Sequence, residues 1–210
     1  MKQTTLIPAR GPYKKSEQSR ERIIDAAIEQ LIEEGYKSLT FRKIANRAEV
    51  SIGNLQHHFE TKQKLIGHML DVVIGGYIDE FGQMIQSTQS PQEQLRSVIN
   101  TVVQDLTTRE TTMFFPELWS MANHDPDVDE LMTQMYERYM AVYHDIIARI
   151  NPSLTPVQIE RAALFIAATV EGHTIFIGQG KRAQGMSHAI EQMAFNSFLK
   201  MIEEGDIPNE

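Results

Sequence analysis

Residues 23–65 of the 210-residue chain read IIDAAIEQLIEEGYKSLTFRKIANRAEVSIGNLQHHFETKQKL, and their pattern specifies the fold of its N-terminal part. Apolar residues recur at helical spacing in three short segments, and Gly35 stands where the first helix should end. Thr40 and Ser51 stand where the second and third helices need N-caps, because hydroxyl oxygens accept bonds from backbone N–H groups. The apolar side chains expected to face inward are Phe41, Ile44, Ala45 and Ala48 in the second helix, and Leu55 and Phe59 in the third. Residues 16–59 therefore predict a helix-turn-helix with a supporting first helix.

The third helix is expected to turn small, amide and imidazole groups outward: Ser51, Ile52, Gly53, Asn54, Gln56, His57 and His58. A short helix with such a face can enter the major groove of DNA and reach base edges. Gly53 permits close backbone approach, while Asn54 and Gln56 can pair with bases. Four residues before and after this helix have side chains that can bind phosphates: Thr40, Arg42, Lys43 and Lys62.

The same segment resembles the DNA-binding domain of the tetracycline-repressor (TetR) family of bacterial regulators. The shared positions are Ala26-Ala27, Gly35, Thr40, Ile44-Ala45, Gly53-x-Leu55, His58-Phe59 and Lys62. The resemblance implies that these residues lie at or near DNA: Thr40, Arg42, Ser51, Gly53, Asn54, Gln56, His57, His58 and Lys62. Two positions depart from the family pattern, because Glu49 replaces the usual glycine of the turn and Gln56 replaces the usual tyrosine.

Composition limits what the whole chain can be. With 41% hydrophobic and 23% charged residues it can build a core, and it contains no cysteine for disulfides or thiolate metal sites. No apolar run approaches the roughly 20 residues of a membrane span, and no signal-peptide core is evident, so we expect a soluble, cytoplasmic protein without membrane partners. The net charge of −8 is uneven, since residues 1–70 are basic on balance and the remainder is strongly acidic. This asymmetry suggests a polyanion as partner of the N-terminal part.

Beyond residue 60 the pattern is helical, with no alternating strand pattern. Helix starts that combine an N-cap with proline occur at Ser90-Pro91, Asp125-Pro126 and Thr155-Pro156. We predict an all-α fold of about nine helices. It would comprise a flexible basic arm at 1–15, the helix-turn-helix domain at 16–60, and a larger effector-binding and dimerisation domain at 61–210.

The stretch FFPELWSMANHDPDVDELM, residues 114–132, resembles the ligand-binding domain of the betaine-type, choline-responsive branch of the family. The residues expected to line an effector pocket are Phe114, Phe115, Trp119, Met135, Tyr139 and His173. Aromatic and methionine side chains at helical spacing are equally typical of a core, so that interpretation stays open. The acidic balance and the aromatic rings favour a cationic ligand, with an apolar or acyl ligand as the alternative.

Small residues in 155–177 and an apolar stripe in the last helix predict a four-helix interface between two copies of the chain. The residues expected there are Ala163, Ala167, Ile190, Met193 and Phe198.

These observations predict a ligand-responsive transcriptional regulator, most commonly a repressor in this family. It would bind a partly palindromic operator in double-stranded DNA as a homodimer, and a small-molecule effector would release it. One alternative is a DNA-binding architectural or division-coupling factor on the same fold. Another is a metal-dependent enzyme built on His124-Asp125 or Glu171-x-His173. Because common catalytic and phosphate-binding motifs are absent from the sequence, we expect no enzymatic activity, no metal and no cofactor.

Overall fold

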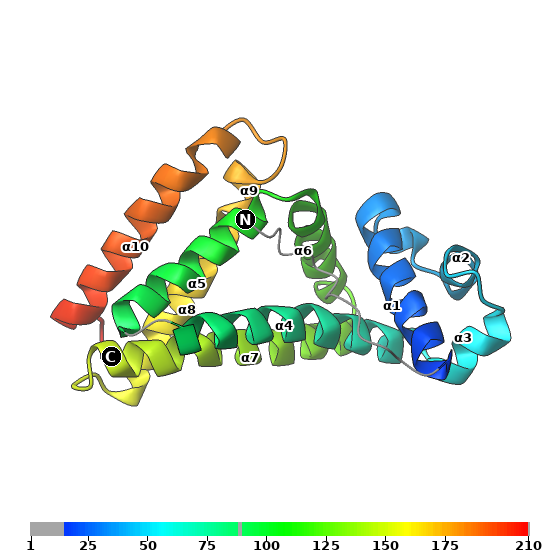
Figure 1. Cartoon of the computed structure of the whole chain (residues 1–210), viewed down its shortest axis with the longest axis horizontal. Coiled ribbons are helices and arrows are strands. Elements are labelled where there is room, and N and C mark those ends of the chain that lie inside the picture. The colour runs from blue at the N-terminus through cyan, green and yellow to red at the C-terminus, as the bar shows by residue number, and fades with distance from the viewer. Residues whose placement is uncertain (1–14, 88–89, 210) are drawn as a thin grey trace. The chain divides into compact units, whose positions relative to one another are not determined.

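The computed structural model describes residues 15–87 and 90–209, and these ranges are almost entirely helical (Figure 1). Within them the chain forms nine α-helices of seven residues or more, one four-residue helix, two short 3-10 helices and no strand. The elements are α1 (Lys15–Glu34), η1 (Tyr36–Ser38), α2 (Phe41–Arg47), α3 (Ile52–His58), α4 (Lys62–Ser87), α5 (Pro91–Leu106), α6 (Arg109–Ala122), α7 (Pro126–Ile150), α8 (Pro156–Gly172), α9 (Thr174–Ile177), η2 (Gln184–Met186) and α10 (Ser187–Glu204). The all-α prediction is confirmed. The predicted basic arm lies outside the described residues, apart from Lys15 at the start of α1.

Hydroxyl side chains cap the N-termini of α2, α3 and α8 at the positions predicted from the sequence. The Thr40 hydroxyl accepts a hydrogen bond from the Lys43 N–H at 3.4 Å, and the Ser51 hydroxyl accepts one from the Asn54 N–H at 3.1 Å. Thr155 forms a reciprocal capping box with the residue three positions later. These caps satisfy N–H groups that have no partner inside a helix, which fixes where α2, α3 and α8 begin.

The chain divides into two compact units. The first comprises Met1–Gly76 and Met113–Met135, and the second comprises Tyr77–Thr112 and Tyr136–Glu210. Helices α4, α6 and α7 contribute residues to both. The expected domain boundary after residue 60 falls inside the first unit, and as a division of functions it stays a prediction.

In the first unit α1, α2 and α3 share a small core (Figure 1). Its fully buried side chains come from all three helices and the segment between α1 and α2: Ile23, Ile28, Leu31, Leu39, Ile44 and Leu55. Phe41, expected to face inward, is only half-buried at the first position of α2. This core holds α3 by one side and leaves its other side exposed.

In the second unit α5, α8 and α10 pack against one another (Figure 1). Buried residues from each helix form the contact: Leu95, Val98 and Ile99 of α5, Ala162, Ala163 and Ile166 of α8, and Phe195, Phe198 and Ile202 of α10. The Arg96 guanidinium lies 3.8 Å from the centroid of the Phe195 ring and covers one edge of this core. None of the described helices is both long and apolar enough to cross a membrane.

Candidate nucleic-acid interface and ligand site

The turn between α2 and α3 keeps a glycine-like backbone without a glycine. Glu49 has φ of 55°, and it is the one non-glycine residue with positive φ in the described part of the chain. The turn is closed by the Val50 N–H, which donates to the Ala45 carbonyl at 3.0 Å. The departure from the family pattern at Glu49 therefore leaves the helix-turn-helix geometry intact, and the left-handed conformation is imposed on a residue that rarely adopts it.

The outward face of α3 is largely as predicted. Leu55 is fully buried, whereas the expected DNA-facing residues are exposed or half-buried: Ser51, Gly53, Gln56 and His57 are exposed, and Asn54 and His58 are half-buried. The two amides differ in their surroundings, because Asn54 Oδ1 accepts a hydrogen bond from the Ser19 hydroxyl of α1 at 2.8 Å. Gln56 is therefore the better placed of the two to reach a base edge.

The four side chains expected on phosphates also differ. Thr40 and Arg42 are exposed at the start of α2. Lys43 Nζ lies 2.7 Å from a carboxylate oxygen of Glu34 in α1. Lys62 Nζ lies 3.8 Å from the centroid of the Tyr36 ring, and burial lowers the pKa of Lys62. Lys43 and Lys62 must therefore leave contacts within the protein to reach DNA.

A second ion pair on α2 and two histidines complete the electrostatics of this surface. An Nη of Arg47 lies 2.7 Å from a carboxylate oxygen of Glu33. Burial lowers the pKa of His58, and so do the neighbouring His57 and Arg20. His58 is therefore mainly neutral at pH 7 and can serve as a hydrogen-bonding group rather than a cation.

A carboxylate from α6 contacts the segment between α1 and α2, inside the first unit. The Tyr36 N–H donates to Glu117 Oε2 at 2.8 Å. Gly35 has φ of 73°, and a Cβ there would lie 3.2 Å from both carboxylate oxygens of Glu117. The sequence analysis missed this contact, although a glutamate inside the apolar run FFPELW was a signal for it.

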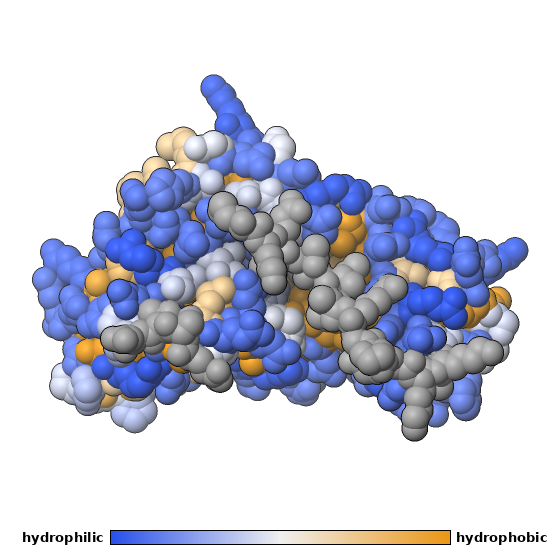
Figure 2. Space-filling view, viewed as in Figure 1, coloured by the Kyte–Doolittle hydropathy of each residue, from blue (hydrophilic) through white to orange (hydrophobic). Residues whose placement is uncertain are grey.

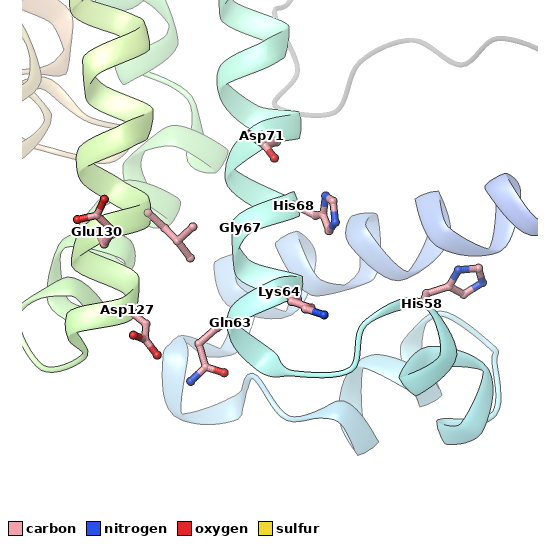
Figure 3. A pocket seen from close by; sticks show the side chains of 9 residues that line it. His58, Gln63, Lys64, Gly67, His68, Asp71, Asp127 and Glu130 are labelled. Atoms are coloured by element: carbon pink, nitrogen blue, oxygen red, sulfur yellow. The ribbon is translucent and has the colours of Figure 1, made fainter.

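An open cleft of about 630 Å³ also lies in the first unit, beside the end of α3. The residues that line it come from α3, α4 and α7: His58, Gln63, Lys64, Gly67, His68, Asp71, Asp127, Glu130 and Leu131. Figure 3 shows Asp127 and Glu130 on the α7 side, and His58 and His68 directed away from them. Of the predicted site residues, only His58 lines this cleft. The cleft is therefore not the expected effector pocket.

The predicted effector residues divide between the two units. Phe114, Phe115, Trp119 and Met135 belong to the first unit, where the Phe115 and Trp119 rings lie 6.4 Å apart between centroids. Tyr139 and His173 belong to the second unit. Phe114, Phe115, Met135 and Tyr139 are buried, while Trp119 and His173 are half-buried. No residue of this list is contradicted, and their role in binding a ligand stays a prediction.

The second unit contains a cluster of buried polar groups around Tyr139. The Tyr139 and Tyr143 hydroxyls lie 2.9 Å apart, and burial together with the nearby Glu171 carboxylate raises the pKa of both. Glu171 Oε2 is buried without a hydrogen-bond partner among the described residues, and this burial raises the pKa of Glu171 to about 7. Two other atoms of the second unit, His173 Nδ1 and Asp105 Oδ2, are also buried without a hydrogen-bond partner among the described residues, and burial raises the pKa of Asp105 to about 6. Because buried polar atoms in proteins nearly always have partners, these groups mark a place where a polar ligand or water can bind.

The sequence offered Glu171 and His173 as an acid–base or metal pair, and His173 also as a residue of the effector pocket. In the described part of the chain no three His, Asp or Glu side chains are arranged to hold a metal ion. Burial lowers the pKa of His173. Tyr143 was not among the residues expected at the effector pocket, although its four-residue spacing from Tyr139 places both on one face of α7.

The expected dimer residues require a correction. Ala163, Ala167 and Phe198 are buried in the core of the chain itself, so they are not available to a partner. Ile190 is half-buried, and Met193 is 66% exposed. Large hydrophobic side chains on the outer faces of α8, α9 and α10 are exposed instead: Leu164, Phe165, Ile175, Phe176 and Met193. The face of the molecule shown in Figure 2 is mostly hydrophilic, with hydrophobic residues in small separate patches.

Two family models match the chain. The model described as bacterial regulatory proteins, tetR family, matches residues 23–69, and the one described as BetI-type transcriptional repressor, C-terminal, matches residues 91–194. Together they include the helix-turn-helix and most of the second unit.

Among individual proteins, the HTH-type transcriptional regulator BetI 1 of Chromohalobacter salexigens is 26% identical over 155 residues, 73% of this chain and 75% of that protein. The structure of a putative transcriptional regulator from Saccharomonospora viridis in complex with choline is 19% identical, with a TM-score of 0.70 over 88% of this chain and 96% of that one. The structure of the transcriptional regulator FadR from Bacillus subtilis in complex with stearoyl-CoA is 18% identical, with a TM-score of 0.68 over 88% and 97% of the two chains. Such likeness shows a shared fold. With the two family models, it establishes that this chain belongs to the TetR family of bacterial transcriptional regulators and carries a BetI-type C-terminal region.

Proposed function

We propose that this regulator is a repressor that binds a partly palindromic operator as a homodimer and leaves it when a small-molecule effector binds. The observation that carries the DNA-binding proposal is the exposed polar face of α3 on an intact helix-turn-helix. Gln56 and His57 are exposed there, while Leu55 anchors the helix in the core. Side chains of this kind read base edges, and the exposed Thr40 and Arg42 suit adjacent phosphates.

The proposed dimer is supported by the exposed apolar residues of α8, α9 and α10. Phe165 is 55% exposed and Met193 is 66% exposed. Large apolar side chains left exposed on three helices of one unit support a protein–protein interface there. A second copy of the chain is the partner that a palindromic operator requires, since two recognition helices then enter successive major grooves.

The proposed effector is a small organic cation bound in the second unit beside Tyr139, Tyr143 and Glu171. A buried carboxylate without a partner attracts positive charge, and tyrosine rings attract cations through their faces. The S. viridis protein was crystallised with choline, which fits this chemistry, whereas the B. subtilis protein was crystallised with an acyl ligand. Glu171 favours the cation, because an acyl chain would leave its carboxyl group without a partner.

Location and activity follow from this proposal. A repressor must reach the bacterial chromosome, so we place the protein in the cytoplasm. We assign it no enzymatic activity, because both family models describe regulators. A purely architectural role on DNA is not favoured for the same reason.

The test is genome-wide footprinting of the purified protein, repeated with increasing choline. We expect a few palindromic sites near promoters, and choline should release the protein from them. Gln56→Ala removes an exposed amide from α3 without touching the core, so it should weaken binding at these sites in a folded protein. Many dispersed sites, or no sequence preference, would contradict the proposed function. Retention of the operator at high choline would contradict only the proposed ligand.

A further inference from the structure

Ile52 is an apolar side chain on an otherwise polar recognition surface. It is the first residue of α3 and is 45% exposed. Within residues 15–87 it is the one large hydrophobic side chain that is exposed; the others begin at Met113. Ile52 is not among the buried residues that form the core of α1, α2 and α3, so the core alone does not require an isoleucine here.

The surroundings of Ile52 leave it accessible to a flat or grooved partner. Gly53 follows it, and a Cβ at that glycine would meet nothing nearer than the Ser51 hydroxyl at 4.0 Å. Gln56 lies four residues later on the same side of the helix and is also exposed. An apolar group and a base-reading amide therefore stand next to each other on the surface that faces DNA.

The major groove offers an aliphatic side chain one apolar group, the 5-methyl group of thymine. A side chain without donors or acceptors gains nothing from the carbonyl, amino and ring-nitrogen groups of the other base edges. We propose that Ile52 reads the methyl group of a thymine in each operator half-site, next to the base contacted by Gln56. This proposal rests on the proposed function, since it requires α3 to lie in the major groove.

The test replaces single methyl groups in an operator selected by the wild-type protein from random-sequence duplexes. Each thymine is changed in turn to deoxyuridine, which keeps the base pair and removes only the methyl group. Burial of one methyl group predicts about a fourfold loss of affinity at one thymine per half-site, and roughly tenfold or more when both half-sites are changed. The Ile52→Ala homodimer lacks this contact in both half-sites, so its affinity for the unmodified operator should also fall roughly tenfold or more. Changing the thymine to deoxyuridine should then have no further effect on its affinity.

Two further measurements assign the effect to Ile52 and to the methyl group. Gln56→Ala, the matched control on the same helix, should keep the deoxyuridine effect at that thymine. At the same position, a 5-methylcytosine pair should bind better than a cytosine pair to the wild type, and equally to Ile52→Ala. Ile52 is exposed and alanine favours helices, so the variant should keep the fold, which circular dichroism can verify.

The outcomes separate this inference from the proposed function. If Ile52→Ala keeps the full deoxyuridine effect, or if no thymine shows one, the role of Ile52 is wrong while operator binding stands. If the wild type selects no sequence, the proposed function fails, and this inference fails with it.

Discussion

The buried carboxyl group of Glu171 should make the stability of this protein depend on pH, and Glu171→Gln should remove that dependence. Glutamine has nearly the same shape but cannot ionise. Burial raises the pKa of Glu171 from its ordinary 4.5 to about 7, so the folded protein binds this proton more tightly than the unfolded chain does. The stabilisation that follows is fully present below pH 4.5 and is lost as the pH rises to about 7.

The size of this effect follows from the same two values. Each pH unit between them is worth about 1.4 kcal/mol, so ionisation of Glu171 costs the wild type roughly 3 kcal/mol by pH 8. Glu171→Gln avoids this cost. Its free energy of unfolding should therefore match that of the wild type below about pH 4 and exceed it by up to roughly 3 kcal/mol near pH 8.

Urea unfolding of both proteins across this pH range, at one protein concentration, measures the difference. Glu160→Gln is the matched control on the same helix, because it removes an exposed carboxylate from α8 and leaves Glu171 in place. If Glu171→Gln is less stable than the wild type at pH 8, or if the difference in stability is the same at every pH, then burial of Glu171 does not destabilise the folded protein at high pH. Choline should bind the wild type more tightly as the pH rises through about 7, since the cation stabilises the ionised carboxylate, and it should bind Glu171→Gln weakly at every pH.

Three other substitutions test other parts of the structure. Glu49→Gly should raise the free energy of unfolding, measured in urea, by about 0.5–1 kcal/mol. Glycine removes the strain of the left-handed backbone, and the added entropy of the unfolded chain offsets part of this gain. Lower stability would show that Glu49 makes a contact worth more than the strain that glycine removes. Phe165→Glu combined with Met193→Glu should give a folded monomer in sedimentation analysis, and a dimer that persists would place the interface elsewhere. Glu117→Ala removes the acceptor of the Tyr36 N–H, so it should destabilise the protein by about 1–2 kcal/mol in urea; unchanged stability would show that water replaces this hydrogen bond without cost.

Much of the fold could be predicted because its signals are local. Thr40 and Ser51 begin α2 and α3 through hydrogen bonds that span three residues, and a sequence displays that spacing directly. The exposed face of α3 followed from the burial of Leu55, which helical periodicity also displays.

The features that could not be predicted depend on which helix faces pack together in the folded chain. Ala163 and Ala167 form a small-residue stripe that suits close packing either with a partner or with the chain's own helices, and periodicity does not distinguish the two. Glu171 suggested acid–base chemistry because its burial and its missing partner become visible only in the folded chain. At Glu49 the sequence departs from the family's glycine, and the sequence alone does not show whether the turn keeps its geometry. The hydrogen bonds of the turn show that it does, because neighbouring residues can impose a backbone conformation that glutamate itself disfavours.

The ion pairs of α2 affect how salt should weaken operator binding. Each phosphate that a protein cation neutralises releases condensed counterions from DNA, and this release makes affinity fall with salt concentration. Lys43, however, already has Glu34 as a counterion within the protein, and Arg47 has Glu33. If Lys43 transfers to a phosphate, the abandoned Glu34 carboxylate attracts a cation from solution and offsets part of the release. The salt dependence would therefore report fewer phosphate contacts than the protein makes, and affinity would decline less steeply with ionic strength than the number of basic side chains suggests.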